Sequence, residues 1–433
     1  MVKRRWLLTA TGVLLLIVGI VFLIFNVARR PMLGVGRNVA VMNVNLSGVN
    51  LGTIKSGSKD IKYPGNQVQL WDRGEYYEFA DVEVKGRGNA TWLQPKKPFQ
   101  LKFARNTELL GLGKNRKWVL LANSLDLTNL RNMASFEVAE MAGMKYAPRG
   151  DFVELAVDGE YEGLYVLIRK TEVSKGSVDL KNDLGILVEL DNLYGRYETC
   201  YYSGEGNCLV ISDVVNKGAE MEAMADFMAK FNRLEMAAAE GNYAGLTEVA
   251  DTESLAQYFL VSEYTADVDA YLTSIYFYSD GARDKIHAGP GWDFDMTFGN
   301  SAWRRSFEPT TDVVLRDELE EWDEQYGHIT KIYYDLLEIP EFQEEVRRVY
   351  QERMEGRGEE LARYIAGQAR RIRPLMILNS AKWWSGERLL GKWMLSLSDY
   401  DSEVEKMVEW TRARGKFMDE KYGNSDITWQ SML

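Results

Sequence analysis

Histidine and cysteine are scarce in this sequence of 433 residues, which contains two of each. His287 and His328 lie far from each other and from both cysteines in the sequence. A structural zinc site usually takes four Cys or His ligands at close spacing, and a Ser-His-Asp triad needs a histidine beside its nucleophile. The sequence therefore argues against both kinds of site.

The two cysteines, Cys200 and Cys208, enclose a segment that includes Gly204 and Gly206. This spacing is typical of a hairpin loop between two short strands, which brings the sulfur atoms within bridging distance. We predict a disulfide between them, as an exported domain allows. The alternative is a pair of reduced, packed thiols.

An uncharged run occupies the N-terminus, from Trp6 to Ala28. As a helix at about 1.5 Å per residue, it matches a hydrocarbon core of roughly 30 Å. A cleaved signal peptide usually has an apolar region of about 7–15 residues that ends in small residues, whereas Arg29 and Arg30 follow this longer run. We therefore predict an uncleaved transmembrane anchor within residues 1–30, and no nearby cysteine suggests a lipoprotein.

Basic residues flank this run unevenly. Lys3, Arg4 and Arg5, together with the free amine, outweigh Arg29 and Arg30 on the other side. The positive-inside rule then leaves the N-terminus in the cytoplasm. We predict a single-pass membrane protein whose main domain is extracytoplasmic.

Positive charge is otherwise in the minority, because 52 Lys and Arg stand against 64 Asp and Glu, for a net charge of −12. Residues 1–30 contain basic but no acidic side chains, so the rest of the chain is more acidic still. An acidic domain does not bind nucleic acid nonspecifically, and we predict no nucleic-acid partner. A hydrophobic content of 46% is enough to bury a large core.

The apolar spacing changes along the chain from a strand period to a helix period. Residues 38–84 alternate as short strands, whereas Leu127 to Met144 and residues 218–239 have helical spacing. Beyond about residue 310 the chain reads as helical. We predict an α+β fold with mixed sheet and helices, made of a core over residues 38–305 and a helical C-terminal part of the same domain over residues 306–433.

Two β-hairpins are predicted within the core. The first turns at Val157 to Glu160, where Asp-Gly forms a favourable two-residue turn, and the second runs from Leu187 to Ile211. Pro340 suits the first position of a later helix.

The first candidate for chemistry is a basic segment. Arg87 to Trp92 contain a turn, and Lys96, Gln100 and Lys102 would share one face of a strand that follows it. Cations fixed beside such a turn can hold phosphates. From spacing alone, a solvated strand face with a structural turn is the favoured interpretation.

The second candidate is the run Gly289 to Asp295. If it is extended, Asp293 and Asp295 point to one side while Trp292 and Phe294 point to the other, toward a core. Two carboxylates on one face repel unless a cation lies between them, and oxygen ligands suit magnesium or calcium. The alternative is a pair of capping or turn aspartates.

Two further acidic pairs occur, Asp267 with Asp269 near the end of a predicted helix and Glu189 with Asp191 on the second hairpin. Acidic pairs at such places are normally caps or solvated surface.

Six motifs stand in the order in which they occur in the CotH kinase family, and the sequence resembles that family on this ground. They are Arg87-Gly-Asn-Ala-Thr-Trp92, Lys96-Lys-Pro-Phe-Gln-Leu-Lys102, Leu130-Arg-Asn132, Val157-Asp-Gly-Glu-Tyr-Glu-Gly-Leu-Tyr165, Asp267-Val-Asp-Ala-Tyr271 and Gly289-Pro-Gly-Trp-Asp-Phe-Asp-Met-Thr-Phe-Gly-Asn300. The resemblance implies a distant, atypical protein kinase fold and the use of ATP with a divalent cation, Mg²⁺ or Mn²⁺. It also implies a protein substrate of the cell envelope or spore-coat type, phosphorylated on Ser or Thr.

The resemblance also implies roles for particular residues. Asp293 and Asp295 match metal-binding or catalytic carboxylates, and Asp269 matches the acidic position of the preceding motif. Lys97 and Lys102 match phosphate-contacting lysines, with Arg87 nearby. Phosphoryl transfer needs a metal, a positioned cation and a carboxylate near the acceptor hydroxyl, so these roles are chemically coherent.

The sequence departs from the family pattern at two positions. Arg169 stands where many relatives have glutamate, and Ser274 stands where some have asparagine. A P-loop, a glycine-rich nucleotide loop and a His-Arg-Asp catalytic loop are also absent. A catalytically silent cell-surface scaffold or binding protein is therefore the alternative to a kinase. Carbohydrate hydrolysis by paired carboxylates is a weaker third hypothesis.

Overall fold

The computed structural model describes residues 38–193, 199–300, 308–310, 314–315, 328–383 and 397–423. The N-terminal anchor predicted over residues 1–30 lies outside these ranges and stays a prediction. Among the residues that are described, no helix combines the length and the apolar character needed to cross a membrane. The predicted α+β class is confirmed, since sheets and helices both contribute to the core.

Seven strands close into a barrel in the order β1-β2-β3-β4-β5-β7-β6, with β6 parallel to β1 and every other pairing antiparallel. Their bounds are β1 Ala40–Asn45, β2 Tyr63–Asp72, β3 Glu75–Gly86, β4 Phe99–Glu108, β5 Lys114–Leu121, β6 Gly150–Val157 and β7 Glu160–Arg169. Closure leaves this sheet without a free edge. The hairpin predicted at Val157 to Glu160 is confirmed as the β6–β7 turn.

Apolar alternation accounts for the barrel interior. Met42 and Val44 on β1 are buried beside Leu101 on β4 and Trp118 on β5, in one cluster enclosed by the strands. Helix α2 (Leu51–Ser56) between β1 and β2 was not predicted. It has only one buried residue, Ile54, so its sequence carries little helical periodicity.

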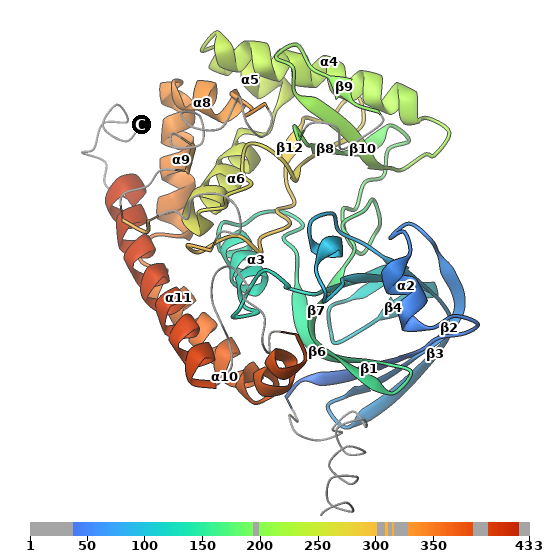
Figure 1. The fold of residues 1–433 in the computed structure, drawn as a ribbon. Helices are drawn as coiled ribbons and strands as arrows, with labels where there is room; N and C mark the ends of the chain where they lie inside the picture. Colours follow the sequence, from blue (N-terminus) through green and yellow to red (C-terminus); the bar gives the residue numbers. More distant parts are fainter. Residues whose placement is uncertain are drawn as a thin grey trace, which may run out of the picture.

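A second, five-stranded sheet has the order β12-β11-β8-β10-β9. Its strands are β8 Gly185–Leu190, β9 Tyr201–Tyr202, β10 Cys208–Val214, β11 Ile275–Asp280 and β12 His287–Ala288. The predicted second hairpin is confirmed, because β8 and β10 pair antiparallel. Figure 1 shows this sheet above the barrel, with helix α4 (Glu220–Ala239) lying along it.

The two cysteines flank the β9–β10 hairpin, with Cys200 just before β9 and Cys208 at the start of β10. Cys200 and Cys208 form a disulfide with their Cα atoms 5.2 Å apart. Cys208 is buried, and its backbone N–H donates to the Asn192 side-chain oxygen at 2.7 Å. The disulfide therefore fastens a short loop that already has a polar anchor.

Helices fill the space on the other side of the molecule (Figure 1). They are α3 Arg131–Met141, α6 Thr252–Thr265, α8 Ile332–Leu337, α9 Pro340–Arg353, α10 Gly358–Trp383 and α11 Leu397–Met418, followed by a π-helical turn at Asp419–Gly423. Helix α5 (Tyr243–Val249) instead packs beside α4, and a single turn of 3₁₀ helix at Thr91–Leu93 lies between β3 and β4. The prediction of Pro340 at a helix start is confirmed. One apolar cluster unites residues of α3, α6, α9 and α10 with the second sheet.

The methionines of α4 differ in their exposure to solvent. Met224 is buried and Met228 packs against the core, but Met221 is 66% exposed. Met221 lies in the first turn of the helix, where its sulfur accepts from the Tyr201 hydroxyl of β9 at 3.3 Å.

Candidate functional site

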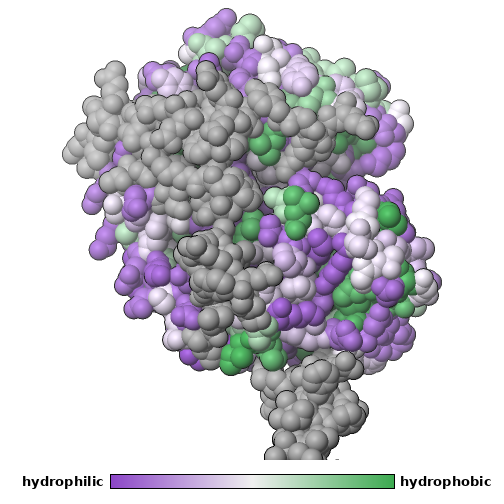
Figure 2. Space-filling model, viewed as in Figure 1, coloured by the Kyte–Doolittle hydropathy of each residue, from purple (hydrophilic) through white to green (hydrophobic). Residues whose placement is uncertain are grey.

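A polar cavity of about 270 Å³ lies where the barrel meets the second sheet. Its wall takes residues from the end of β3 and the turn after it, from the ends of β5 and β7, from β8 and β11, and from the loop after β12. Figure 2 shows the surface hollowed between the lower and upper parts of the molecule, with apolar residues only in small groups on the coloured surface. The cavity is therefore built from segments far apart in the sequence.

Basic side chains line the barrel side of this cavity, namely Lys59, Lys85, Arg87 and Lys170. Burial lowers the pKa of Lys85 and of Lys170, against the raising effects of Asp60 and Glu172 respectively. The Lys170 Nζ lies 3.6 Å from Glu172 and the Lys85 Nζ lies 3.9 Å from Asp60.

Arg87 extends from the end of β3 toward the acidic side of the cavity. Its guanidinium carbon lies over the Trp292 ring, 4.3 Å from the ring centroid. Burial lowers the pKa of Arg87, and the neighbouring Asp293 carboxylate opposes this effect. Arg87 therefore joins the barrel to the aspartate loop by a cation–π contact and by charge.

Acidic side chains face the cavity from the other side. Asp293, Asp295 and Glu189 line it. Burial raises the pKa of Asp295 well above its ordinary value, and the charges of Asp293 and Asp269 raise it further. Among the described residues no basic side chain forms an ion pair with Asp295. This carboxyl is therefore held in a position where a cation would stabilise its charged form.

The aspartates share the cavity for a different reason from the one predicted. The backbone at Asp293 has φ of 67°, in the left-handed region, so the segment is not extended. Phe294 packs in the core against Phe136, with ring centroids 6.3 Å apart, as predicted. The predicted orientation of Trp292 toward a core is confirmed only in part, because its ring packs against two apolar clusters but also lines the cavity, with the Arg87 guanidinium over it.

Two further residues of the cavity wall share the left-handed backbone conformation of Asp293. Asn123 and Ser274 also line it and also have positive φ, 48° and 60°. Residues other than glycine adopt this conformation at a cost of order 1–3 kcal/mol, and such strain often marks functional sites.

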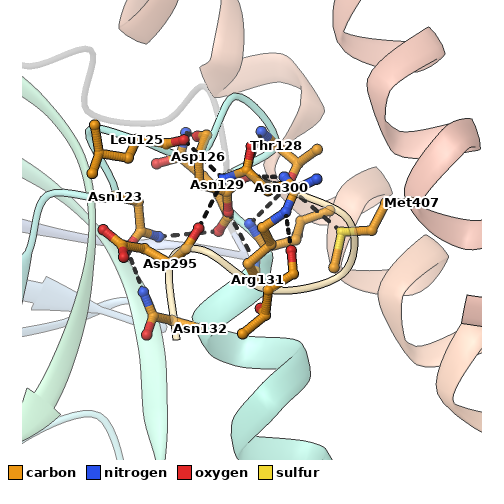
Figure 3. A network of polar contacts seen from close by, with 12 residues as sticks. Asn123, Leu125, Asp126, Thr128, Asn129, Arg131, Asn132, Asp295, Asn300 and Met407 are labelled. Carbon is orange, nitrogen blue, oxygen red and sulfur yellow. Dashed lines mark hydrogen bonds and ion pairs between the residues drawn. The ribbon is translucent and has the colours of Figure 1, made fainter. Parts of the chain in front are cut away.

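Asn132, the second residue of α3, holds the aspartate loop in place. Its side-chain oxygen accepts from the Phe294 backbone N–H at 3.1 Å, and its amide nitrogen donates to the Asn123 side-chain oxygen at 3.2 Å. Figure 3 shows Asp295 beside Asn123 and Asn132. The Asn300 side chain donates to the Asp295 carbonyl oxygen at 2.9 Å and so fastens the other end of the loop.

A buried ion pair between Arg131 and Asp126 supports the same loop. Arg131 donates to the Asp126 carboxylate and, through Nε, to the Thr297 carbonyl oxygen at 2.8 Å. Asp126 also accepts from the Thr128 backbone N–H at 2.9 Å. The Leu130-Arg131-Asn132 motif thus positions the acidic loop (Figure 3).

Asp269 lies in the chain that follows α6. Its backbone N–H donates to the Asp267 carboxylate at 3.1 Å, and the neighbouring Val268 N–H donates to the Met296 carbonyl oxygen at 3.4 Å. Asp269 does not line the cavity, but its charge is near enough to raise the pKa of Asp295.

Lys97 and Lys102 are not brought to this cavity, contrary to their expected roles as phosphate contacts. The Lys97 Nζ donates to the Trp92 carbonyl oxygen and lies 5.0 Å from the centroid of the Trp92 ring. The Lys102 Nζ lies 3.9 Å from Glu83, farther along the barrel. Lys96 does not share a strand face with Gln100 and Lys102 as predicted, because β4 begins only at Phe99.

Lys96 is buried, with its ammonium donating to the Leu164 carbonyl oxygen, and burial lowers its pKa to about 7. Gln100 does line the cavity.

Lys85 and Lys170 line the cavity but were not among the predicted residues. Lys85 precedes Arg87 by two residues, and residues two apart on a strand share a face, so strand alternation was a usable signal. Lys170 follows the last residue of β7 and carried no comparable signal.

The departures from the family pattern fall in different places. Ser274 lines the polar cavity, whereas Arg169 lines a second cavity with Arg149 and Lys175. The departure at Arg169 therefore does not alter the acidic lining of the first cavity, which consists of Glu189, Asp293 and Asp295 on this side.

The acidic side fits a magnesium-type ion. No group of three or more His, Cys, Asp or Glu side chains with metal-binding geometry occurs among the described residues. Mg²⁺ in nucleotide sites, however, is commonly held by only one or two carboxylates together with substrate phosphates and water. Asp293 and Asp295 supply two such carboxylates.

Comparison with known proteins agrees with this geometry. A family model described as CotH kinase protein matches residues 82–418, most of the chain. The chain belongs to the CotH kinase family. A search of curated proteins finds no match. The CotH match begins within β3 and ends with α11, so it contains both walls of the cavity apart from Lys59 and Asp60.

Proposed function

We propose that this CotH family member is a membrane-anchored protein kinase that transfers the γ-phosphate of ATP to Ser or Thr of a cell-envelope or spore-coat-type protein. The observation that carries the proposal is the opposition of charge across one cavity, with Lys85, Arg87 and Lys170 facing Asp293 and Asp295. Phosphoryl transfer depends mainly on positioning and charge stabilisation, which this arrangement provides.

Each wall has a separate role in this proposal. Arg87 and the two lysines bind the phosphates, and the Trp292 ring holds the Arg87 side chain in position. Asp293 and Asp295 hold Mg²⁺ or Mn²⁺, which when bound neutralises phosphate charge. Asp269 is proposed to accept the proton of the acceptor hydroxyl, as its family motif implies.

The test of this activity is transfer of labelled phosphate from γ-labelled ATP to casein or another hydroxyl-rich acceptor protein, with the full chain and either metal ion. Incorporation in the wild type, lost in Asp293→Asn, supports a kinase. Label that is also incorporated by Asp293→Asn would come from a contaminating kinase and would count against the assignment.

Anchoring and the envelope substrate rest on the sequence. The uncharged run Trp6 to Ala28 supports a transmembrane segment, and the excess of basic residues before it supports an external main domain. Protease added to intact cells should digest the main domain and spare the N-terminus. Complete protection of the main domain would reverse the proposed topology.

A silent scaffold remains the second candidate, and the burial of Asp295 favours it. Burial and neighbouring charges raise the pKa of Asp295, and a protonated carboxyl is a poor metal ligand. The two candidates differ in metal-dependent nucleotide binding, which a scaffold does not need.

A further inference from the structure

A second cavity, of about 300 Å³, lies beside β7 and shares no residue with the first. Arg149, Arg169 and Lys175 line it, together with a single carboxylate, Asp179. Neighbouring residues at the end of β7 therefore serve different cavities, Arg169 the second and Lys170 the first.

Carboxylates of the protein neutralise little of the positive charge of Arg149, Arg169 and Lys175. Asp179 is paired with Lys181, and Arg149 lies 3.7 Å from Glu140 at a largely exposed site, where an ion pair is weak. Within the described ranges, neither Arg169 nor Lys175 forms an ion pair with a carboxylate. The pKa of Arg169 is lowered by burial and by the like charge of Arg149. An anion between these side chains would relieve that repulsion.

The cavity is held open by fixed backbone. A tight turn carries Lys175, with the Ser174 N–H donating to the Val178 carbonyl oxygen and the Ser177 N–H donating to the Ser174 carbonyl oxygen, both at 3.0 Å. Gly176 fits against β5 so closely that a Cβ there would lie 2.1 Å from the Lys114 carbonyl oxygen. On the opposite side, the Tyr146 hydroxyl donates to the Asp179 carbonyl oxygen at 3.2 Å.

The chemistry of this cavity favours a phosphoryl group over a carboxylate. A phosphoryl group carries a charge of about −1.5 to −2 with three acceptor oxygens, and guanidinium groups bind such oxygens in pairs. Two arginines and a lysine match the charge of a phosphoryl group better than they match the single negative charge of a carboxylate. A basic cavity is also unexpected on a chain with a net charge of −12.

We propose that this cavity binds a phosphoryl group carried by a phosphorylated Ser or Thr of a protein partner, at an accessory site separate from the nucleotide cavity. The origin of that phosphoryl group in the partner rests on the proposed kinase function. The binding itself does not, because the site uses none of the residues assigned to ATP or metal.

The experiment is calorimetric titration of the full-length Asp293→Asn chain at low ionic strength with N-acetyl-phosphoserine amide. Inorganic phosphate and N-acetyl-aspartyl amide are titrated in parallel. The phosphoserine compound should bind, and more tightly than the aspartyl compound. Use of the Asp293→Asn background keeps this result independent of catalysis, so a failed kinase assay would leave it intact.

Substitutions place the binding within the cavity. Arg169→Gln, or separately the exposed Lys175→Gln, should weaken phosphoserine binding about tenfold, as expected for loss of one charge-assisted contact. Arg105→Gln, an exposed position on β4 outside both cavities, is the matched control and should leave affinity unchanged.

Three results would overturn the proposal. They are no phosphoserine binding, equal binding of the aspartyl compound, and binding that neither Arg169→Gln nor Lys175→Gln weakens. Binding of inorganic phosphate without the phosphoserine compound would identify a site for free phosphate and would also reject a protein partner. Thermal unfolding of each variant shows whether it is folded, and the exposed position of Lys175 keeps the test available if Arg169→Gln is unstable.

Discussion

The Arg87 guanidinium stacks on the Trp292 ring at 4.3 Å from the ring centroid, and this contact joins the turn that follows β3 to the loop that carries Asp293 and Asp295. The phosphate-binding and metal-binding walls are therefore in direct contact, although the two partners are 205 positions apart in the sequence. Cation–π contacts are worth about 0.5–2 kcal/mol, depending on solvent exposure.

Removal of this ring should weaken nucleotide binding. We expect Trp292→Leu to raise the dissociation constant for ATP by about threefold to tenfold, because Arg87 loses the surface that holds it. Trp292→Phe retains an aromatic face and should have a smaller effect. Equilibrium binding of a fluorescent ATP analogue measures both, and equal loss in the two variants would contradict a role for the ring face.

Asp295→Asn should stabilise the protein in the absence of metal. The pKa of Asp295 is raised in the folded protein above its ordinary value of 3.8. The protein therefore loses stability as the pH rises above 3.8 toward the folded-state pKa. An amide does not ionise, so the variant should unfold about 1–3 °C higher at neutral pH. Thermal unfolding in a chelator measures this effect.

The matched control for Asp295 is Asp126→Asn. Asp126 is paired with Arg131, so its loss leaves a buried guanidinium without its carboxylate and should lower the unfolding temperature. If Asp295→Asn were destabilised as much as Asp126→Asn, the assignment of Asp295 as an uncompensated carboxyl would be wrong.

Glu154 on β6 provides a pH effect away from the cavity. Burial raises its pKa from 4.5 to about 7. Ionisation of the buried Glu154 carboxyl destabilises the folded state, so the free energy of unfolding should fall by up to about 3 kcal/mol between pH 4.5 and pH 7. Glu154→Gln should flatten this part of the denaturation profile, whereas Glu160→Gln, at an exposed position, should not. A wild-type profile with the same slope as Glu154→Gln would argue against the shift.

The disulfide should stabilise its loop locally. Closing so short a loop contributes about 2–3 kcal/mol in the chain-entropy account. Reductant should lower the unfolding temperature of the wild type but not of the Cys200→Ala, Cys208→Ala double variant. Mass spectrometry under thiol-trapping conditions should find the linked peptides, and recovery of two alkylated thiols would contradict an oxidising location.

Local patterns predicted much of the fold because they are set by short-range chemistry. The Asp158-Gly159 turn and the start of α9 at Pro340 follow from turn and helix preferences. Closure of the barrel by parallel pairing of β1 with β6 leaves no such signature, because it joins strands more than 100 residues apart.

Family motifs marked most of the residues of the site that the sequence predicted. Asp293, Asp295 and Arg87 do meet in one cavity. The segment is bent at Asp293, which has a positive φ, and Trp292 lines the cavity as well as packing against the core. The late start of β4 separated Lys96 from the expected strand face. Lys170 reaches the cavity through tertiary packing, which residue spacing does not reveal.

The most direct test of the account is calorimetry of ATP binding to the full chain with Mg²⁺ or Mn²⁺, alongside Asp293→Asn and Lys102→Gln. The account predicts metal-dependent binding that is lost in Asp293→Asn and retained in Lys102→Gln, since Lys102 lies outside the cavity. Absence of ATP binding with either metal ion, or unchanged binding in Asp293→Asn, would contradict it.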